Sequence, residues 1–197
     1  AATEGGIFAE EIVAVGDFTA DQGIRPGSNV EKLATLPTPF KEGGVVSAGN
    51  ASQISDGAAA VLVTTSAKAA ELGLTPIVRF HTGVMAGTDP IIMLTGPIPA
   101  TEKVLAKSGL TIDDIGAFEV KGAFASVVGA WLAETGADPK LTNPNGGAMA
   151  IGHPLGASGA RLATTLIHQM KRNNIRYGLQ TMCEGGGMAN ATIIELL

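Results

Sequence analysis

The stretch YGLQTMCEGGGMANATIIELL, residues 177–197, contains two apolar runs separated by a cluster of glycines. Tyr177–Cys183 and Met188–Leu197 predict two strands, because apolar and β-branched residues dominate both runs. The CEGGG sequence between them predicts the turn of a closing hairpin. Strands joined by such a short turn pair antiparallel, so any parallel sheet that this hairpin joins becomes a mixed sheet.

Helices and strands alternate through the residues that precede this hairpin. Alternation of this kind predicts an α/β fold, in which a mixed β-sheet is covered by helices. The predicted elements, in order, are a strand at Pro76–Met85, a helix at Ala100–Ser108, a strand at Ile115–Val120, a helix at Ala123–Thr135 and a helix at Ser158–Arg172.

An earlier segment has its own strand and helix pattern. DGAAAVLVTT, residues 56–65, predicts a buried strand, and the following SAKAAELG predicts a helix that stops at Gly73. The first fifty residues are rich in the Pro and Gly punctuation of loops. The region before about residue 66 therefore belongs to a different unit, which this chain does not complete.

The composition narrows the function classes. Charged residues make up 16% of the 197, hydrophobic residues 45%, and 27 are glycine, so we expect part of the exterior to be covered by another subunit or by a missing portion. A net charge of −5 argues against a nucleic-acid partner, and no apolar run is long enough to span a membrane. One cysteine excludes an internal disulfide, and with no secretory signal it predicts a cytoplasmic protein.

Two residues are candidates for chemistry. His153 lies in NPNGGAMAIGHPLGASGAR, where small residues allow close approach and Pro154 keeps the histidine out of helical conformation. Cys183 lies where a strand ends, immediately before Gly185, and ligands of open α/β sheets bind beyond the carboxyl ends of strands. A cysteine and an imidazole can move protons near neutral pH, so the pair indicates acyl or carbanion chemistry.

Structural interpretations compete with these. A lone cysteine is often an inert core residue, and a lone loop histidine is unspecific. His81 and His168 fit structural positions on a strand and on a helix flank. One cysteine and three scattered histidines predict no metal site, and no phosphate-binding or dinucleotide-binding glycine motif is present.

NPNGGAMAIGHPLGASGAR and CEGGGMANATIIE resemble the two C-terminal motifs of the thiolases, the acyltransferases that make or cleave 3-oxoacyl-CoA. SAGNASQISDGAAAVLV, TGPIPATEKVLAKSGLTIDDIGAFEV and GAFASVVGAWLAETGA also resemble thiolase sequence. The resemblance covers the chain but corresponds to the second half of a full thiolase. It implies the five-layered α/β/α/β/α thiolase fold. Residues 1–75 would be the end of the loop domain and the last strand and helix of the incomplete N-terminal half, and residues 76–197 would form a C-terminal βαβαβαββ domain.

The resemblance assigns roles to individual residues. In thiolases the histidine matched by His153 activates a nucleophilic cysteine and stabilises the thioester enolate oxygen. The cysteine matched by Cys183 takes or returns the α-proton of an acyl-CoA, and the N–H of Gly185 would help to bind the oxyanion. Four further residues match contacts to coenzyme A or its pocket: Ser52, Ala48, Phe124 and Arg25.

Two departures from the family pattern qualify this assignment. The nucleophilic cysteine of thiolases lies in their N-terminal half, and this chain has no counterpart to it. Where the family has Asn-Glu-Ala-Phe, this chain has Lys121 and Gly122 before Ala-Phe, so the Asn that holds a water in the enolate oxyanion hole is missing.

The sequence therefore predicts the C-terminal portion of a thiolase acyltransferase, an enzyme that acts on acyl-CoA and coenzyme A as substrates and holds no permanent cofactor. We expect it to need an N-terminal portion that carries the nucleophilic cysteine, to be inactive alone, and to form a dimer or tetramer. The alternatives are a thiolase-like protein that binds acyl-CoA without catalysis, motivated by Lys121 and Gly122, and a structural subunit or degenerate remnant.

Overall fold

The computed structural model describes all 197 residues, and four of its strands form a single sheet. Their order across the sheet is β1-β4-β3-β2. β2 and β3 are parallel, whereas β4 runs antiparallel to both β3 and β1, so the predicted mixed sheet is confirmed. The strands are β1 (Val78–Gly87), β2 (Ala117–Lys121), β3 (Tyr177–Cys183) and β4 (Met188–Leu196).

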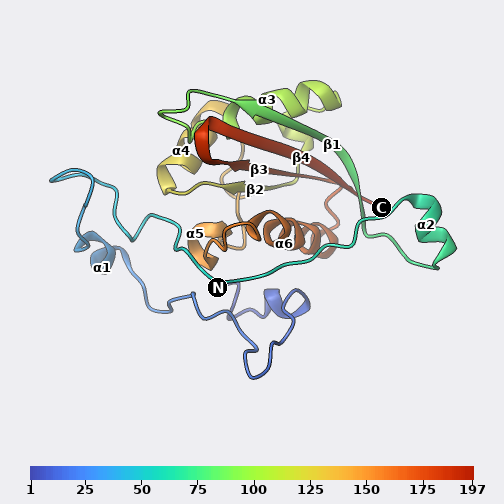
Figure 1. Cartoon of the computed structure of the whole chain (residues 1–197), viewed down its shortest axis with the longest axis horizontal. Helices are drawn as coiled ribbons and strands as arrows, with labels where there is room; N and C mark the ends of the chain where they lie inside the picture. Colours follow the sequence, from blue (N-terminus) through green and yellow to red (C-terminus); the bar gives the residue numbers. More distant parts are fainter.

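Helices cover both faces of this sheet (Figure 1). α3 (Pro97–Ser108) and α4 (Ala125–Thr135) lie on one face, and α5 (Gly147–Ile151) and α6 (Ser158–Asn173) lie on the other. Short 3-10 turns join some of the elements: η2 (Ile112–Asp114) precedes β2, and η3 (Gly185–Gly187) makes the turn of the β3–β4 hairpin. The predicted helical covering and closing hairpin are therefore confirmed.

The main core lies between the sheet and the α3–α4 layer. Phe118 and Val120 of β2 and Leu179 of β3 project into this layer, where the buried Trp131 of α4 packs edge-on against Phe118 with ring centroids 5.4 Å apart. The indole N–H of Trp131 donates to the hydroxyl of Thr101 on α3 at 2.9 Å, and both side chains are buried. That hydrogen bond joins α3 to α4 in an otherwise apolar layer.

Replacing Thr101 with valine is expected to lower the free energy of unfolding by about 1–3 kcal/mol, because the Trp131 N–H is then buried without an acceptor. Valine keeps the branched shape, so little packing is lost. Thr164→Val is the matched control: its hydroxyl donates to the carbonyl of Ala160 four residues earlier, as Thr101 does to Pro97, but it accepts from no buried donor. Urea unfolding that gives equal losses for the two variants would contradict the prediction.

The first 75 residues contain η1 (Ile7–Glu10), α1 (Val30–Ala34) and α2 (Ser66–Glu71), and α1 and α2 lie beyond opposite ends of the sheet (Figure 1). Phe8 of η1 is buried against Ala148, Ile151 and Leu162 of α5 and α6. The start of the chain is thus attached to the sheet through the α5–α6 layer.

Two sequence expectations are wrong. Residues 56–65 form no strand, because no neighbouring strand pairs with them. Leu62 and Val63 of this segment are 80% and 81% exposed. A strand needs a neighbour to accept its hydrogen bonds, and no other strand of this chain lies beside this segment. The fifth strand implied by a βαβαβαββ order is also missing, because its place beside β2 is taken by a single bridge between Phe118 and Thr142.

Candidate active site

Cys183 is the last residue of β3 and is buried. The neighbouring parallel strand β2 ends at Lys121, which pairs in register with Met182. The ends of these two strands therefore lie side by side, and Lys121 Nζ donates to Cys183 Sγ at 3.9 Å. Lys121 is also buried, so the thiol and the ammonium share an environment with little water.

His153 is held by its backbone against the segment Gln53–Ser55. Its N–H donates to the carbonyl of Gln53 at 2.8 Å, and a parallel bridge joins it to Ile54. The preceding Gly152 has φ of 89°, and a Cβ at that position would lie 2.3 Å from Ser55 Oγ. Only glycine fits here, because the chain itself approaches closely and because L residues rarely adopt this φ.

The His153 imidazole is oriented by Ser158, the first residue of α6. Nδ1 lies 2.6 Å from Ser158 Oγ, and the buried Ser158 hydroxyl also donates to the carbonyl of Pro154 at 3.2 Å. A hydroxyl has one proton, so when that proton goes to Pro154 the imidazole must donate from Nδ1. Nε2 then carries the lone pair and is the basic nitrogen.

The environment favours the neutral form of His153. Burial lowers the pKa of this imidazole below 6.5, and the positive charge of Lys121 lowers it further. His153 is therefore uncharged at pH 7 and can accept a proton through its free nitrogen.

The segment Asn50–Ser55 connects the histidine to the start of α4. On one side Ala51 forms an antiparallel bridge with Phe124, and the N–H of Ser52 donates to the carbonyl of Ala123 at 2.8 Å. On the other side the same segment pairs with His153. Ser52, Phe124 and His153, three of the predicted site residues, are thus close together in the structure.

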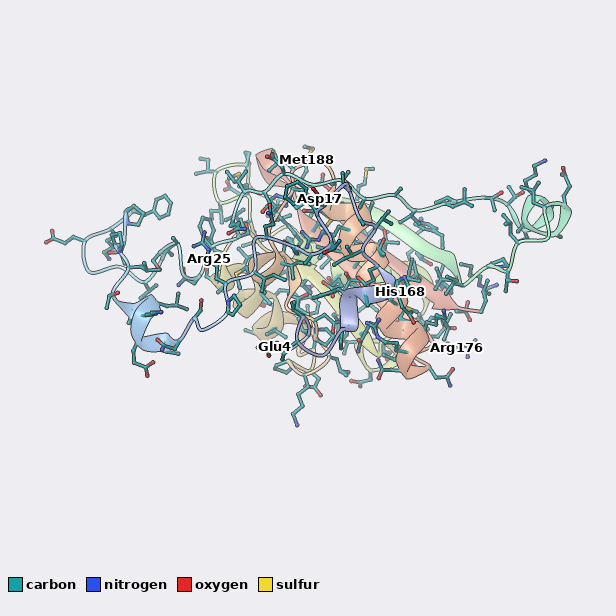
Figure 2. All side chains as sticks on the ribbon, turned by 90° about the horizontal axis from the view of Figure 1, so that it is seen from below. Glu4, Asp17, Arg25, His168, Arg176 and Met188 are labelled. Carbon is teal, nitrogen blue, oxygen red and sulfur yellow. The ribbon has the colours of Figure 1, made fainter.

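The other predicted site residues are placed less closely. Ala48 is exposed in the turn from Ser47 to Asn50, just before this segment. Gly185 is exposed and begins the turn that follows Cys183. Arg25 is exposed on the loop between η1 and α1 (Figure 2), and no hydrogen bond or ion pair joins its side chain to the residues above.

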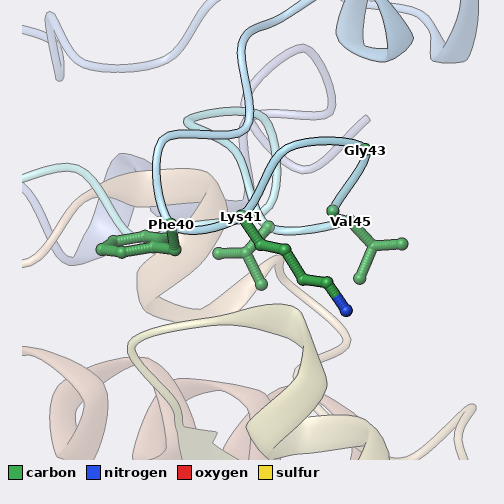
Figure 3. A pocket seen from close by; sticks show the side chains of 6 residues that line it. Phe40, Lys41, Gly43 and Val45 are labelled. Carbon is green, nitrogen blue, oxygen red and sulfur yellow. The ribbon is translucent and has the colours of Figure 1, made fainter.

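A pocket of about 310 Å³ lies in the loop Phe40–Val46 (Figure 3). The Lys41 side chain extends from this loop between Phe40 and Val45. Phe40 meets the ring of Phe124 edge-on, with centroids 6.1 Å apart, so the pocket adjoins the start of α4. None of its lining residues is His153, Cys183 or Lys121, and the volume is at the lower end of the range for small-molecule sites.

Two contacts of the site were not predicted from the sequence: Ser158 with His153, and Lys121 with Cys183. A serine five residues after the histidine, at the start of an expected helix, is a weak signal because serine is common at helix starts.

The structure contains no cluster of three His, Cys, Asp or Glu side chains that could hold a metal ion. It also contains no helix with the length and hydropathy needed to cross a membrane.

Family models account for nearly the whole chain. The thiolase C-terminal domain matches residues 74–196, and the thiolase N-terminal domain matches residues 1–67. The chain belongs to the thiolase family. A steroid 3-ketoacyl-CoA thiolase of Mycobacterium tuberculosis is 54% identical over all of this thiolase chain, and an acetyl-CoA acetyltransferase of Rhizobium meliloti is 47% identical over the same extent. These matches cover 49% and 52% of the two relatives, so the chain spans about half their length.

Solved structures place the thiolase chain in the same fold. A Bacillus anthracis acetyl-CoA acetyltransferase matches 100% of this chain and 52% of its own with a TM-score of 0.95 and 38% identity. A human mitochondrial 3-ketoacyl-CoA thiolase in complex with CoA matches 100% of this chain and 51% of its own, with a TM-score of 0.91 and 34% identity. The predicted thiolase fold is confirmed.

Proposed function

We propose that this chain supplies the acid–base half of a thiolase active site, which transfers acyl groups between acyl-CoA and either coenzyme A or acetyl-CoA. One observation carries the proposal: the segment Asn50–Ser55 pairs with Phe124 on one side and with His153 on the other. That pairing supports the proposal because Ser52 and Phe124, which match contacts to coenzyme A or its pocket, lie close to the imidazole of His153. A bound thioester would therefore lie within reach of His153.

The residues take distinct roles in the proposed reaction. The neutral His153 accepts the proton of a nucleophilic cysteine through the nitrogen that Ser158 leaves free. Cys183 takes the α-proton of an acetyl group during condensation, and returns it during thiolysis. The N–H of Gly185 donates to the oxyanion of the tetrahedral step.

The nucleophilic cysteine must come from elsewhere, because Cys183 is the one cysteine of this chain. We propose that it comes from an N-terminal portion equivalent to the half of the relatives that this chain does not cover. We use the term assembled thiolase for this chain together with that portion. A dimeric peroxisomal thiolase of Saccharomyces cerevisiae has a TM-score of 0.92 to this chain, which supports a dimer or tetramer here. We also propose a cytoplasmic location and a division of the chain near residue 75.

Acyl transfer by the assembled thiolase is tested with a short 3-oxoacyl-CoA and with a bulky one, since the 54% identical relative is named for steroid substrates. We expect CoA-dependent cleavage of at least one of them, measured by loss of the 3-oxoacyl-CoA absorbance. Binding of acetyl-CoA in calorimetry without cleavage of either substrate would instead favour the non-catalytic alternative. That alternative rests on Lys121 and Gly122 alone.

A further inference from the structure

Lys121 is a buried cation without a carboxylate partner. Its side chain lies at the end of β2 and is 6% exposed, and no ion pair of this chain includes it. Its one side-chain hydrogen bond goes to the sulfur of Cys183. Burial of an unpaired ammonium is costly, so a position of this kind is expected where a reaction produces negative charge.

The positive charge reaches both catalytic candidates. It lies 3.9 Å from Cys183 Sγ, and it contributes to the lowered pKa of His153. The buried Cys183 and the half-buried His153, to which the proposed function assigns proton transfer, are therefore close to the same positive charge. In the family an asparagine stands at this position and acts through a water, whereas a lysine can donate directly.

We propose that Lys121 is a catalytic residue whose ammonium neutralises the negative charge that forms beside the Cys183 sulfur. The proposal rests on the proposed function and concerns the step in which the α-proton moves. In thiolysis the Cys183 thiol gives its proton to the α-carbon of the leaving enolate. The C=C π pair of the enolate forms the new C–H bond, and an electron pair of the enolate oxygen re-forms the thioester carbonyl. The negative charge passes from oxygen to the Cys183 sulfur, where the Lys121 ammonium lies, and Lys121 keeps its own proton.

The test measures how Cys183 reacts with two alkylating reagents of similar size, anionic iodoacetate and neutral iodoacetamide. Because the chain has one cysteine, mass spectrometry of the intact chain reports Cys183 alone. Both reagents attack the same sulfur, so the ratio of their rates cancels the thiolate fraction. The ratio therefore reports the electrostatic potential beside Sγ rather than the general access to it.

We expect the iodoacetate-to-iodoacetamide ratio to fall about tenfold in Lys121→Met, and to stay near the wild-type value in Lys121→Arg, which keeps the charge. Lys171→Met is the matched control, since this exposed lysine at the end of α6 removes one positive charge elsewhere. An unchanged ratio in Lys121→Met overturns the role of Lys121. If circular dichroism shows that Lys121→Met is unfolded, the same comparison is made with Lys121→Gln.

Turnover separates this proposal from the proposed function. In the assembled thiolase we expect Lys121→Met to lower kcat for thiolysis by at least tenfold with a smaller change in KM, because the charge acts on the step and not on binding. Equal kcat values in the two proteins overturn the catalytic role even if the reagent ratio falls. If the wild-type assembled thiolase turns over no substrate while the reagent ratio still depends on Lys121, the proposed function is overturned. Lys121 then remains the cation beside Cys183, without a role in turnover.

Discussion

Replacing Cys183 with alanine is expected to lower the rate of α-proton exchange between acetyl-CoA and deuterated water by roughly 10²–10⁴-fold in the assembled thiolase. The expectation follows from position: Cys183 ends β3 at the edge where ligands of α/β sheets bind, and it is buried beside the Lys121 cation. Alanine removes the only thiol of this chain without adding volume. Exchange is followed by NMR or mass spectrometry of the recovered acetyl-CoA.

Exchange is more informative than thiolysis for this variant because it requires enolate formation but no acyl transfer to a nucleophile. Met182→Leu is the control, since this neighbouring half-buried side chain has similar volume and no proton to give. We expect the control to keep the wild-type exchange rate within a factor of about three. Undiminished exchange in Cys183→Ala, with acetyl-CoA binding intact, would refute the assignment of the acid–base role to this residue.

Local signals made most of the sheet and its helices predictable. Gly136 has φ of 70° and ends α4 where the sequence placed the end, because glycine readily adopts this conformation after a helix. The β3–β4 hairpin was predictable for the same reason, from the glycines between two apolar runs. α3 begins at Pro97, earlier than the predicted Ala100, because proline is tolerated in the first turn of a helix and not only outside it.

Features that depend on distant partners were not predictable. Residues 56–65 have the composition of a strand, but composition does not supply the neighbouring strand that a ladder needs. His153 and Cys183 could each be selected as candidates from their glycine-rich surroundings. The contact of Cys183 with Lys121 could not, because it depends on the register of β2 against β3, which brings the ends of the two strands together.

The burial of Glu119 is another property that the sequence pattern of its strand does not predict. IGAFEV reads as a plain apolar strand, yet its glutamate is 1% exposed, and burial raises the pKa of Glu119 to about 8, with the charge of Glu11 adding to the effect. Glu11 Oε2 accepts from the hydroxyl of Thr165 at 2.7 Å. Glu11 Oε1 and Glu119 Oε2 are both buried and accept no hydrogen bond from a donor group. Burial of a carboxylate oxygen without a hydrogen-bond donor is costly, which favours the protonated form of Glu119.

The charged side chains on the elements packed near Glu119 do not cancel the rise of its pKa. Arg172 Nη1 of α6 lies 3.7 Å from Glu11 Oε1. His168 of α6, labelled in Figure 2, has its Nδ1 3.4 Å from Oε2 of Glu10, the last residue of η1. Neither makes an ion pair with Glu119. The buried carboxyl of Glu119 is therefore neutral in the folded protein at pH 7.

The free energy of unfolding is expected to fall as the pH rises from about 4.5 to about 8. Between the ordinary pKa of 4.5 and the raised value of about 8, the folded chain keeps the Glu119 proton that the unfolded chain has lost. Stability is therefore present at low pH and is lost on approaching pH 8, by an amount on the order of 4–5 kcal/mol at full ionisation. That loss is a large part of the total stability of an ordinary domain.

Glu119→Gln isolates this contribution, because glutamine has nearly the same shape as glutamate and does not titrate. We expect urea unfolding to give similar stabilities for the two proteins at pH 5, and a variant that is more stable than the wild type by several kcal/mol at pH 8. His153, whose pKa is lowered, gives an opposite slope below pH 6.5, and it cancels in the difference between the two proteins. The exposed Glu102→Gln serves as the control and should keep the wild-type slope. Parallel pH profiles for Glu119→Gln and the wild type would show that Glu119 is ionised in the folded chain.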